Sequence, residues 1–492
     1  MNILQAKLEI KGAIEAYLMK DDYGKYRIPV LAQRPILLIG PPGIGKTAIM
    51  EQIAGECGIG LVAYTMTHHT RQSAVGLPMI EKHTYGGREY SATQYTMSEI
   101  IGAVYDAMAA TKKKEGILFL DEINCVSETL APTMLQFLQK KMFGNHKIPD
   151  GWIIVAAGNP PEYNKSVREF DIVTLDRVRK IDIAEDFSVW KSYAYERNVH
   201  PSIITYLEIK KENFYRIETT ASGKRFVTAR GWEDLSFMIF AQELLGRPVT
   251  EAMVSQYVQH PQIAKDFANY YDLYNQYKED YHVEEILNGK IRPETSSRIL
   301  EARFDEKLSL IGLLMGCLGN DFKEWSAQNT VVTRLYQVLV DVKAAGGADE
   351  AMVLMLQAEQ VRLETDAAVK EQAPKLLETL DRYLRLIKQG NGFTAVKAAF
   401  EKEVDELGAL ADRGNAHLSA AFDFMEQTFG ESQEMIIFIT ELNTSRPAVD
   451  FIRENGCERY YKYNEGLLFS SGRDKVLQEI NSVRSYMDFL GI

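Results

Sequence analysis

A glycine-rich segment followed by lysine and threonine has the residue types and the spacing needed to hold phosphate groups. Residues 40–47 match the pattern G-x-x-x-x-G-K-[ST], with an apolar run before them and a helical pattern after them. Glycines let backbone amides approach phosphate oxygens, and the positive end of the following helix attracts the anion. The residues predicted to bind the nucleotide are Gly40, Pro41, Pro42, Gly43, Ile44, Gly45, Lys46, Thr47 and Ala48.

Two carboxylates at the end of another apolar run complete a set of groups suited to phosphoryl transfer. The run at residues 117–120 ends in Asp121 and Glu122, which is the arrangement of a Walker B element. Lys46 is expected to contact the β- and γ-phosphates, while Thr47 and Asp121 are expected to hold Mg²⁺. We predict that Glu122 orients and polarises the attacking water, because phosphoryl transfer needs an in-line nucleophile and neutralised charge.

The elements that must position these residues are short apolar runs that alternate with helical patterns in the first third of the chain. The expected strands are 35–39, 61–65, 117–120, 152–157 and 181–183, and the expected helices are 47–57, 97–110 and 127–141. Continuous apolar runs separated by helices are typical of a parallel sheet that is covered on both faces. The sequence therefore predicts an α/β, doubly wound core around a parallel five-stranded sheet.

The pattern after the last expected strand becomes mostly helical. We predict three regions: a nucleotide-binding core at 1–183, a helical lid and extension at 184–325, and an all-helical C-terminal domain at 326–492. Apolar residues that share a helix face in the last region are Leu376, Leu377, Leu380, Leu384 and Ile387; Val396, Phe400, Val404 and Leu407; and Val476, Ile480, Val483 and Met487. We interpret these faces as helix-bundle packing, with a partner-binding face as the alternative.

Composition and charge narrow the classes of function. The chain has 492 residues, of which 46% are hydrophobic and 25% charged, as in folded soluble proteins. At about 150 residues per domain, this length predicts two to four domains. The net charge of -12 and the pI of about 5.4 argue against broad, sequence-independent binding to nucleic acid. They do not exclude a local basic channel.

Cysteine spacing and hydropathy add two expectations. The four cysteines contain no C-x-x-C pair, which gives no support to a zinc ribbon or a thioredoxin-like motif. The longest apolar run, residues 308–318, is shorter than the roughly 18 residues that suggest a membrane span. The first 20 residues lack the apolar stretch of a signal peptide. We therefore expect no membrane span and a cytoplasmic location.

Taken together, the motifs resemble AAA+ ATPases and, within them, the MoxR-like, dynein-related branch. The segments that carry the resemblance are 40–47, 119–124, 158–160 and 175–177, within a region of roughly 30–240. The resemblance implies ATP and Mg²⁺ as cofactors and two further residues that contact the γ-phosphate. Asn159, after the fourth expected strand, corresponds to the sensor 1 residue, although an asparagine before proline is also common in turns. Arg230, at the start of an expected lid helix, corresponds to the sensor 2 arginine.

The resemblance also implies an arginine that one subunit inserts into the site of its neighbour to stabilise charge in the transition state. Leu175-Asp176-Arg177-Val178 resembles the L-D-R-F element of MoxR-like proteins, which makes Arg177 the candidate. The last position departs from that element, because Val178 replaces phenylalanine. Arg168 and Arg179 compete for the role, and a salt bridge at the surface or between domains is the alternative for Arg177.

Proteins of this branch usually form hexameric rings with ATP at the subunit interfaces, so the resemblance implies a homo-oligomer. It also implies a partner that carries a von Willebrand factor A domain, with which such ATPases act as chaperones that remodel or mature client proteins. Insertions at two places line the ring pore in this branch. Here those places are 71–95, with a hairpin tip expected at Gly86-Gly87, and 140–150; solvated loops are the alternative for both.

The leading hypothesis is therefore Mg²⁺-dependent ATP hydrolysis that drives the remodelling of client proteins. A second hypothesis is an assembly switch that binds ATP to order a complex and hydrolyses it slowly; the presence of Glu122 argues against it. A third is a nucleic-acid translocase, which the acidic charge disfavours.

Overall fold

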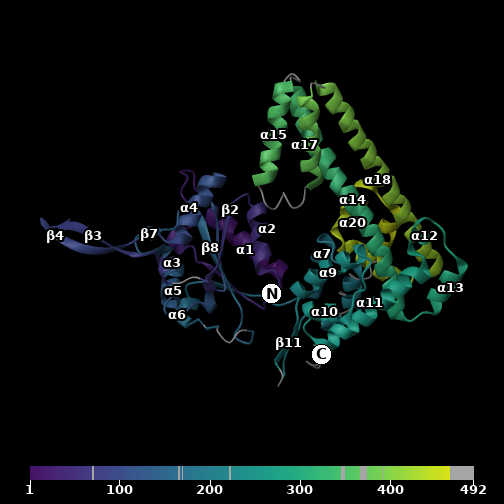
Figure 1. Cartoon of the computed structure of the whole chain (residues 1–492), viewed down its shortest axis with the longest axis horizontal. Coiled ribbons are helices and arrows are strands. Elements are labelled where there is room, and N and C mark those ends of the chain that lie inside the picture. Colours follow the sequence, from purple (N-terminus) through teal and green to yellow (C-terminus); the bar gives the residue numbers. More distant parts are fainter. Residues whose placement is uncertain are drawn as a thin grey trace, which may run out of the picture. The chain divides into compact units, whose positions relative to one another are not determined.

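The computed structural model describes residues 1–68, 71–163, 167–168, 170–220, 223–344, 349–365, 374–389 and 392–465 (Figure 1). The chain divides into two compact units. Unit 1 contains Met1–Val189 together with Thr228–Arg230, and unit 2 contains Trp190–Val227 and most of the described chain from Gly231 onwards. The amphipathic pattern predicted at residues 476–487 lies outside the described residues.

A five-stranded parallel sheet forms the centre of unit 1 and confirms the predicted fold class. Its strands are β1 (Ile36–Ile39), β2 (Gly60–Thr65), β5 (Gly116–Asp121), β8 (Trp152–Gly158) and β9 (Arg179–Asp182). They lie in the order β2-β5-β8-β1-β9, and every neighbouring pair is parallel. The carboxyl ends of β1, β5 and β8 therefore meet at one edge of the sheet, where ligands bind in open parallel sheets.

Helices cover both faces of this sheet, which explains why its strands are continuous apolar runs. Successive side chains of a strand point to opposite faces. Leu38 accordingly packs with α1 (Ile3–Leu18) and α2 (Lys46–Glu56), while its neighbour Leu37 packs with α4 (Glu99–Thr111) and α5 (Ala131–Lys140). The helix predicted at 127–141 begins only at α5, where a proline in its first turn favours the helix start.

Two hairpins project from the connections of unit 1. Strands β3 (Pro78–Tyr85) and β4 (Arg88–Tyr95) form an exposed two-stranded ribbon that extends away from the sheet (Figure 1). Its tip is Gly86-Gly87, as predicted, and both glycines have positive φ (58° and 80°), as a two-residue turn between twisted strands requires. A shorter hairpin, β6 (Met142–Phe143) and β7 (His146–Lys147), touches the ribbon: His146 Nε2 lies 3.1 Å from the carbonyl oxygen of Tyr95.

Unit 2 is mainly helical, as expected. Its helices are α7 (Phe187–Glu196) and α9 (Ala229–Leu244), whose first residues belong to unit 1, and α8 (Pro201–Ile209), α10 (Glu251–Tyr257), α11 (Pro261–Tyr281), α12 (Val283–Leu287), α13 (Pro293–Glu301), α14 (Phe304–Ala344), α15 (Asp349–Thr365), α17 (Pro374–Lys388), α18 (Gly392–Thr428), α19 (Gln433–Thr444) and α20 (Arg446–Asn455). The hairpin formed by β10 (Arg216–Thr220) and β11 (Gly223–Val227) was not predicted from the sequence.

The amphipathic helix faces of unit 2 pack into two apolar cores. The predicted face of α17 is buried or partly buried in the core that it shares with parts of α14, α15 and α18, which agrees with the helix-bundle interpretation. Val404 is an exception, because its side chain is 42% exposed. Helix α14 runs without a break through residues 325 and 326, so the predicted domain boundary falls inside a single helix. The division of the chain into three domains stays a prediction.

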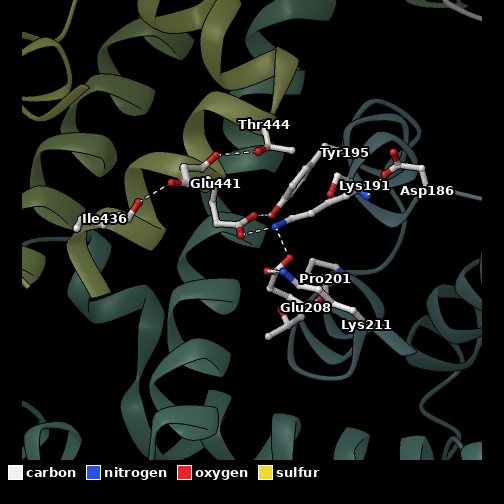
Figure 2. A network of polar contacts seen from close by, with 12 residues as sticks. Asp186, Lys191, Tyr195, Pro201, Glu208, Lys211, Ile436, Glu441 and Thr444 are labelled. Atoms are coloured by element: carbon white, nitrogen blue, oxygen red, sulfur yellow. Dashed lines mark hydrogen bonds and ion pairs between the residues drawn. The ribbon is translucent and has the colours of Figure 1, made fainter. Parts of the chain in front are cut away.

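A buried ionic network joins elements of unit 2 that are far apart in the sequence (Figure 2). Lys191 on α7 pairs with Glu208 on α8 (Nζ–Oε2 2.7 Å) and with Glu441 on α19. The hydroxyl of Tyr195 donates a hydrogen bond to Glu441 (2.6 Å), and Lys211 pairs with Glu208 (2.7 Å). The network therefore connects α7 and α8 to α19, which lies near the end of the described residues.

Candidate nucleotide-binding site

The glycine-rich segment forms the loop between β1 and α2. Gly43 and Gly45 have positive φ (75° and 93°), a conformation that favours glycine and allows the backbone to curl around an anion. A Cβ atom on Gly43 would lie 3.2 Å from the hydroxyl oxygen of Thr228 and 3.4 Å from the Cβ of Arg230. The loop therefore lies directly against the segment that carries Arg230, whose role as sensor 2 stays a prediction.

Lys46 is buried at the base of this loop, and its side chain is only 8% exposed. Its ammonium group donates hydrogen bonds to the carbonyl oxygens of Gly40 and Pro41 (both 2.8 Å) and to Oδ1 of Asn159 (2.9 Å). An ammonium has three N–H donors, so these acceptors engage all of them. Burial lowers the pKa of Lys46 to about 8, although the nearby carboxylate of Asp121 acts in the opposite direction.

The two carboxylates predicted from the sequence lie at the carboxyl end of β5. The hydroxyl of Thr47 donates to Oδ2 of Asp121 (3.2 Å), and the backbone N–H of Glu122 donates to the other oxygen of the same carboxylate (2.9 Å). A hydroxyl and a carboxylate in contact form a hard-oxygen donor set, which fits Mg²⁺. Glu122 has φ 55° and ψ 35°, a left-handed conformation that costs a non-glycine residue on the order of 1 kcal/mol and often occurs at functional sites.

Asn159 follows the end of β8 and meets Lys46 through its side chain, so the structure brings Lys46, Thr47, Asp121 and Asn159 together at one edge of the sheet. Sequence reasoning missed Asn124, whose side-chain amide donates to the carbonyl oxygen of Asn159 (2.8 Å). The signal available was an asparagine two residues after Glu122, but its partner follows β8, 35 positions later, and could not be identified from spacing.

The three candidate arginines differ in how they are engaged. Arg168 forms an ion pair with Glu128 (2.5 Å), and Arg179 forms one with Glu9. Arg177 is exposed, and no carboxylate in the described part of the chain forms an ion pair with it. Val178, which departs from the expected phenylalanine, is buried in the core on the α4–α5 face of the sheet. Of the three guanidinium groups, that of Arg177 is therefore the most available to a neighbouring molecule.

A family model for the ATPase family associated with various cellular activities (AAA) matches residues 36–175, which run from β1 to the end of the short helix α6 (Ile172–Leu175). This match covers the glycine-rich loop, both carboxylates and Asn159. The segment therefore forms an AAA ATPase domain.

A curated relative matches over a shorter stretch. The chain is 41% identical over 54 residues to the ATP-dependent zinc metalloprotease FtsH of Hahella chejuensis (strain KCTC 2396), which is 11% of this chain and 8% of the length of that relative. Within the described residues, no group of three or more His, Cys, Asp or Glu side chains is placed to hold a metal ion. None of the helices described is both long and apolar enough to cross a membrane.

Proposed function

We propose that this chain is a MoxR-like AAA+ ATPase that hydrolyses ATP with Mg²⁺ and uses the energy to remodel or mature client proteins. One observation carries the ATPase proposal. At the carboxyl edge of the sheet in the AAA domain, Lys46 of α2 contacts Asn159, which follows β8, and the adjacent Thr47 contacts Asp121 at the end of β5. Such a set binds phosphate, holds a divalent ion and senses the terminal phosphate, and Glu122 stands next to it.

The protein groups have distinct tasks in this reaction. Lys46 exchanges its neutral acceptors for oxygens of the β- and γ-phosphates, and the loop amides donate to the same anion. Thr47 and Asp121 would hold Mg²⁺, which neutralises negative charge on the phosphate oxygens. Glu122 orients the water and accepts its proton as the water oxygen bonds to the γ-phosphorus. The bond from that phosphorus to the β–γ bridging oxygen breaks, which releases ADP and inorganic phosphate.

The test of this proposal compares steady-state ATPase activity with Mg²⁺ for wild type and Glu122→Gln, together with particle mass with and without ATP. Loss of a general base typically slows a reaction by about 10²–10⁴-fold, so the variant should bind ATP but turn over at least a hundredfold more slowly. Glu51→Gln is the matched control, because this exposed glutamate lies on α2 outside the site. A wild type that assembles with ATP but shows no turnover would instead support the assembly switch.

We further propose that the protein forms a ring, hexameric as in the MoxR-like branch, in which Arg177 completes the site of a neighbouring subunit. The exposure of Arg177 supports this role, because Arg168 and Arg179 are paired within their own chain. Mixing subunits that carry Arg177→Ala with subunits that carry Glu122→Gln tests the idea. Some interfaces in mixed rings then combine an intact Glu122 with an intact Arg177, so activity should reappear. Two inactive variants that stay inactive when mixed would contradict it.

The proposed partner is a protein with a von Willebrand factor A domain, and the proposed contact with clients is through the ribbon β3–β4 and the hairpin β6–β7. The aromatic side chains of Tyr85 and Tyr90, exposed on the ribbon, are suited to grip a polypeptide. Co-expression with a neighbouring gene that encodes a D-x-S-x-S metal site, followed by ATP-dependent co-purification, tests the partner. Deletion of residues 79–94, which should abolish stimulation by a client but spare basal turnover, tests the ribbon.

A further inference from the structure

Asn124 lies where three parts of the candidate site meet. It sits in the short 3-10 helix Ile123–Cys125, two residues after Glu122, and is only 5% exposed. Its side-chain Nδ2 donates to the carbonyl oxygen of Asn159 (2.8 Å), and its own carbonyl oxygen accepts from the backbone N–H of Arg168 (2.9 Å). One buried residue thus joins the turn after β5, the end of β8 and the stretch of chain that leads to Arg177.

The contact with β8 depends on a residue that has no side chain. A Cβ atom on Gly158 would lie 2.5 Å from Oδ1 of Asn124, 2.7 Å from its Cγ and 2.9 Å from its Nδ2. Distances below 3.0 Å are essentially never tolerated by a real Cβ, so the amide plane of Asn124 rests directly against the backbone of Gly158. Glycine at this position is what lets the amide come close enough to reach Asn159.

This contact matters because Asn159 lies beyond the sheet. The pairing of β8 with β1 ends at Gly158, which faces Ile39. The next residue therefore has no strand neighbour in that pairing to fix its peptide group, and Pro160 follows it. The hydrogen bond from Asn124 fixes the Asn159 carbonyl, and the side chain of Asn159 then reaches Lys46 at 2.9 Å. A small displacement of a reacting or sensing group is enough to slow catalysis strongly.

We propose that Asn124 is a positioning residue for ATP turnover, which holds Asn159 in place against the backbone of Gly158. This role rests on the proposed ATPase function. Asn124 makes none of the hydrogen bonds recorded for Lys46 or Thr47, so it acts on the rate of turnover and not on the capture of ATP. Asn124 is also hydrogen-bonded to the backbone of Arg168, so the same residue holds both Asn159 and the chain segment at Arg168.

The first experiment measures kcat and ATP affinity for Asn124→Ala and for Asn124→Asp, which keeps the shape but loses the N–H donor. Both variants should turn over about tenfold to a hundredfold more slowly, with an ATP dissociation constant within about twofold of wild type. Unchanged ATP binding also shows that the variant has folded. Asn288→Ala, an exposed asparagine in unit 2, is the matched control and should equal wild type.

The second experiment is a double-mutant cycle with Gly158→Ala. In the wild-type background the added methyl group collides with Asn124 and should slow turnover at least as much as Asn124→Ala does. In the Asn124→Ala background the amide is gone, so the same methyl group should cost less than about threefold. Such non-additivity is the signature of two residues in direct contact.

The outcomes separate this role from the ATPase proposal itself. If wild type hydrolyses ATP while Asn124→Ala and Asn124→Asp keep its kcat, or if the two changes in the cycle are additive, the positioning role is overturned and the ATPase stands. If Asn124→Ala loses ATP affinity as strongly as kcat, the role is structural only, and the proposal is again overturned. If wild type shows no turnover, the proposed function fails, and this role fails with it.

Discussion

Two lysines, one in each unit, are both buried and hydrogen-bonded, but their partners differ in charge. Lys46 in unit 1 is 8% exposed and donates to two backbone carbonyls and the amide oxygen of Asn159, all of them neutral. Lys191 in unit 2 is 6% exposed and is held by the carboxylates of Glu208 and Glu441 (Figure 2). The same side chain, equally buried, is thus held by dipoles in one region and by charges in the other.

The pKa values reflect this difference. Without an adjacent ion pair, burial dominates at Lys46 and lowers its pKa to about 8. In unit 2, burial alone would raise the pKa of Glu208, but Lys191 and Lys211 together outweigh burial and the pKa falls below its ordinary value. Burial also raises the pKa of Tyr195 well above its ordinary value, and its neighbour Glu441 adds to the rise.

The comparison indicates which lysine can change partners. Neutral acceptors leave the charge of Lys46 without an ion pair among the described residues, so a phosphate that replaces them gains a favourable interaction. The carboxylates around Lys191 already compensate its charge. Removing the lysine would leave the buried carboxylate of Glu441 without its ionic partner, while Glu208 would keep its pair with Lys211. We therefore regard Lys46 as a binding group that is kept available and Lys191 as a fixed connection within unit 2.

The largest effect is expected from Lys191→Met. Breaking a buried ion pair by removing one partner typically costs about 3–5 kcal/mol, so the free energy of unfolding of unit 2 should fall by that amount. Denaturant unfolding measures it. Lys375→Met is the matched control, because its pair with Glu406 is exposed (41% and 51%) and should contribute no more than about 1 kcal/mol. Equal losses in the two variants would contradict the distinction drawn here.

A smaller effect, on binding and not on folding, is expected from Lys46→Met. The variant should bind ATP about a hundredfold more weakly, or about 2.7 kcal/mol, because it loses charged hydrogen bonds to phosphate. At neutral pH its free energy of unfolding without nucleotide should stay within about 1 kcal/mol of wild type, because the variant also removes a buried charge that has no ion pair among the described residues. Titration with a fluorescent ATP analogue and denaturant unfolding measure the two quantities. A loss of stability as large as that of Lys191→Met would refute the comparison.

The third effect is a dependence of stability on pH, which is small within any single pH unit. The pKa of Lys46 is about 8 in the folded protein and ordinarily 10.5. Between these values the unfolded chain binds more protons than the folded chain, so the contribution of Lys46 to stability rises with pH, by at most about 1.4 kcal/mol per pH unit. Denaturant unfolding at several pH values from about 8 to 10.5 measures the free energy of unfolding of wild type and of Lys46→Met. The difference between the two should rise with pH over this window. A difference that is flat over this window would show that the lysine keeps its ordinary pKa.

The same contrast shows what the sequence could predict. The five strands and the residues at their ends were predictable, because a strand buried on both faces is a continuous apolar run and the phosphate loop has a fixed local spacing. The ion pair of Lys191 with Glu441 has no local signal, since the two residues are 250 positions apart. The bond of Asn124 with Asn159 was missed for the same reason. The hairpin β10–β11 was missed because its strands are short and largely polar.

The separation between Lys191 and Glu441 has a consequence for the order in which the chain folds as it is made. The residues of unit 1 up to Val189 are available early, but Lys191 emerges long before its partner on α19 exists. Translation at about 5–20 residues per second puts roughly 10–50 seconds between the two. During that interval the α7–α8 segment holds a lysine without its second carboxylate, so unit 2 can complete its core only after α19 has been synthesised.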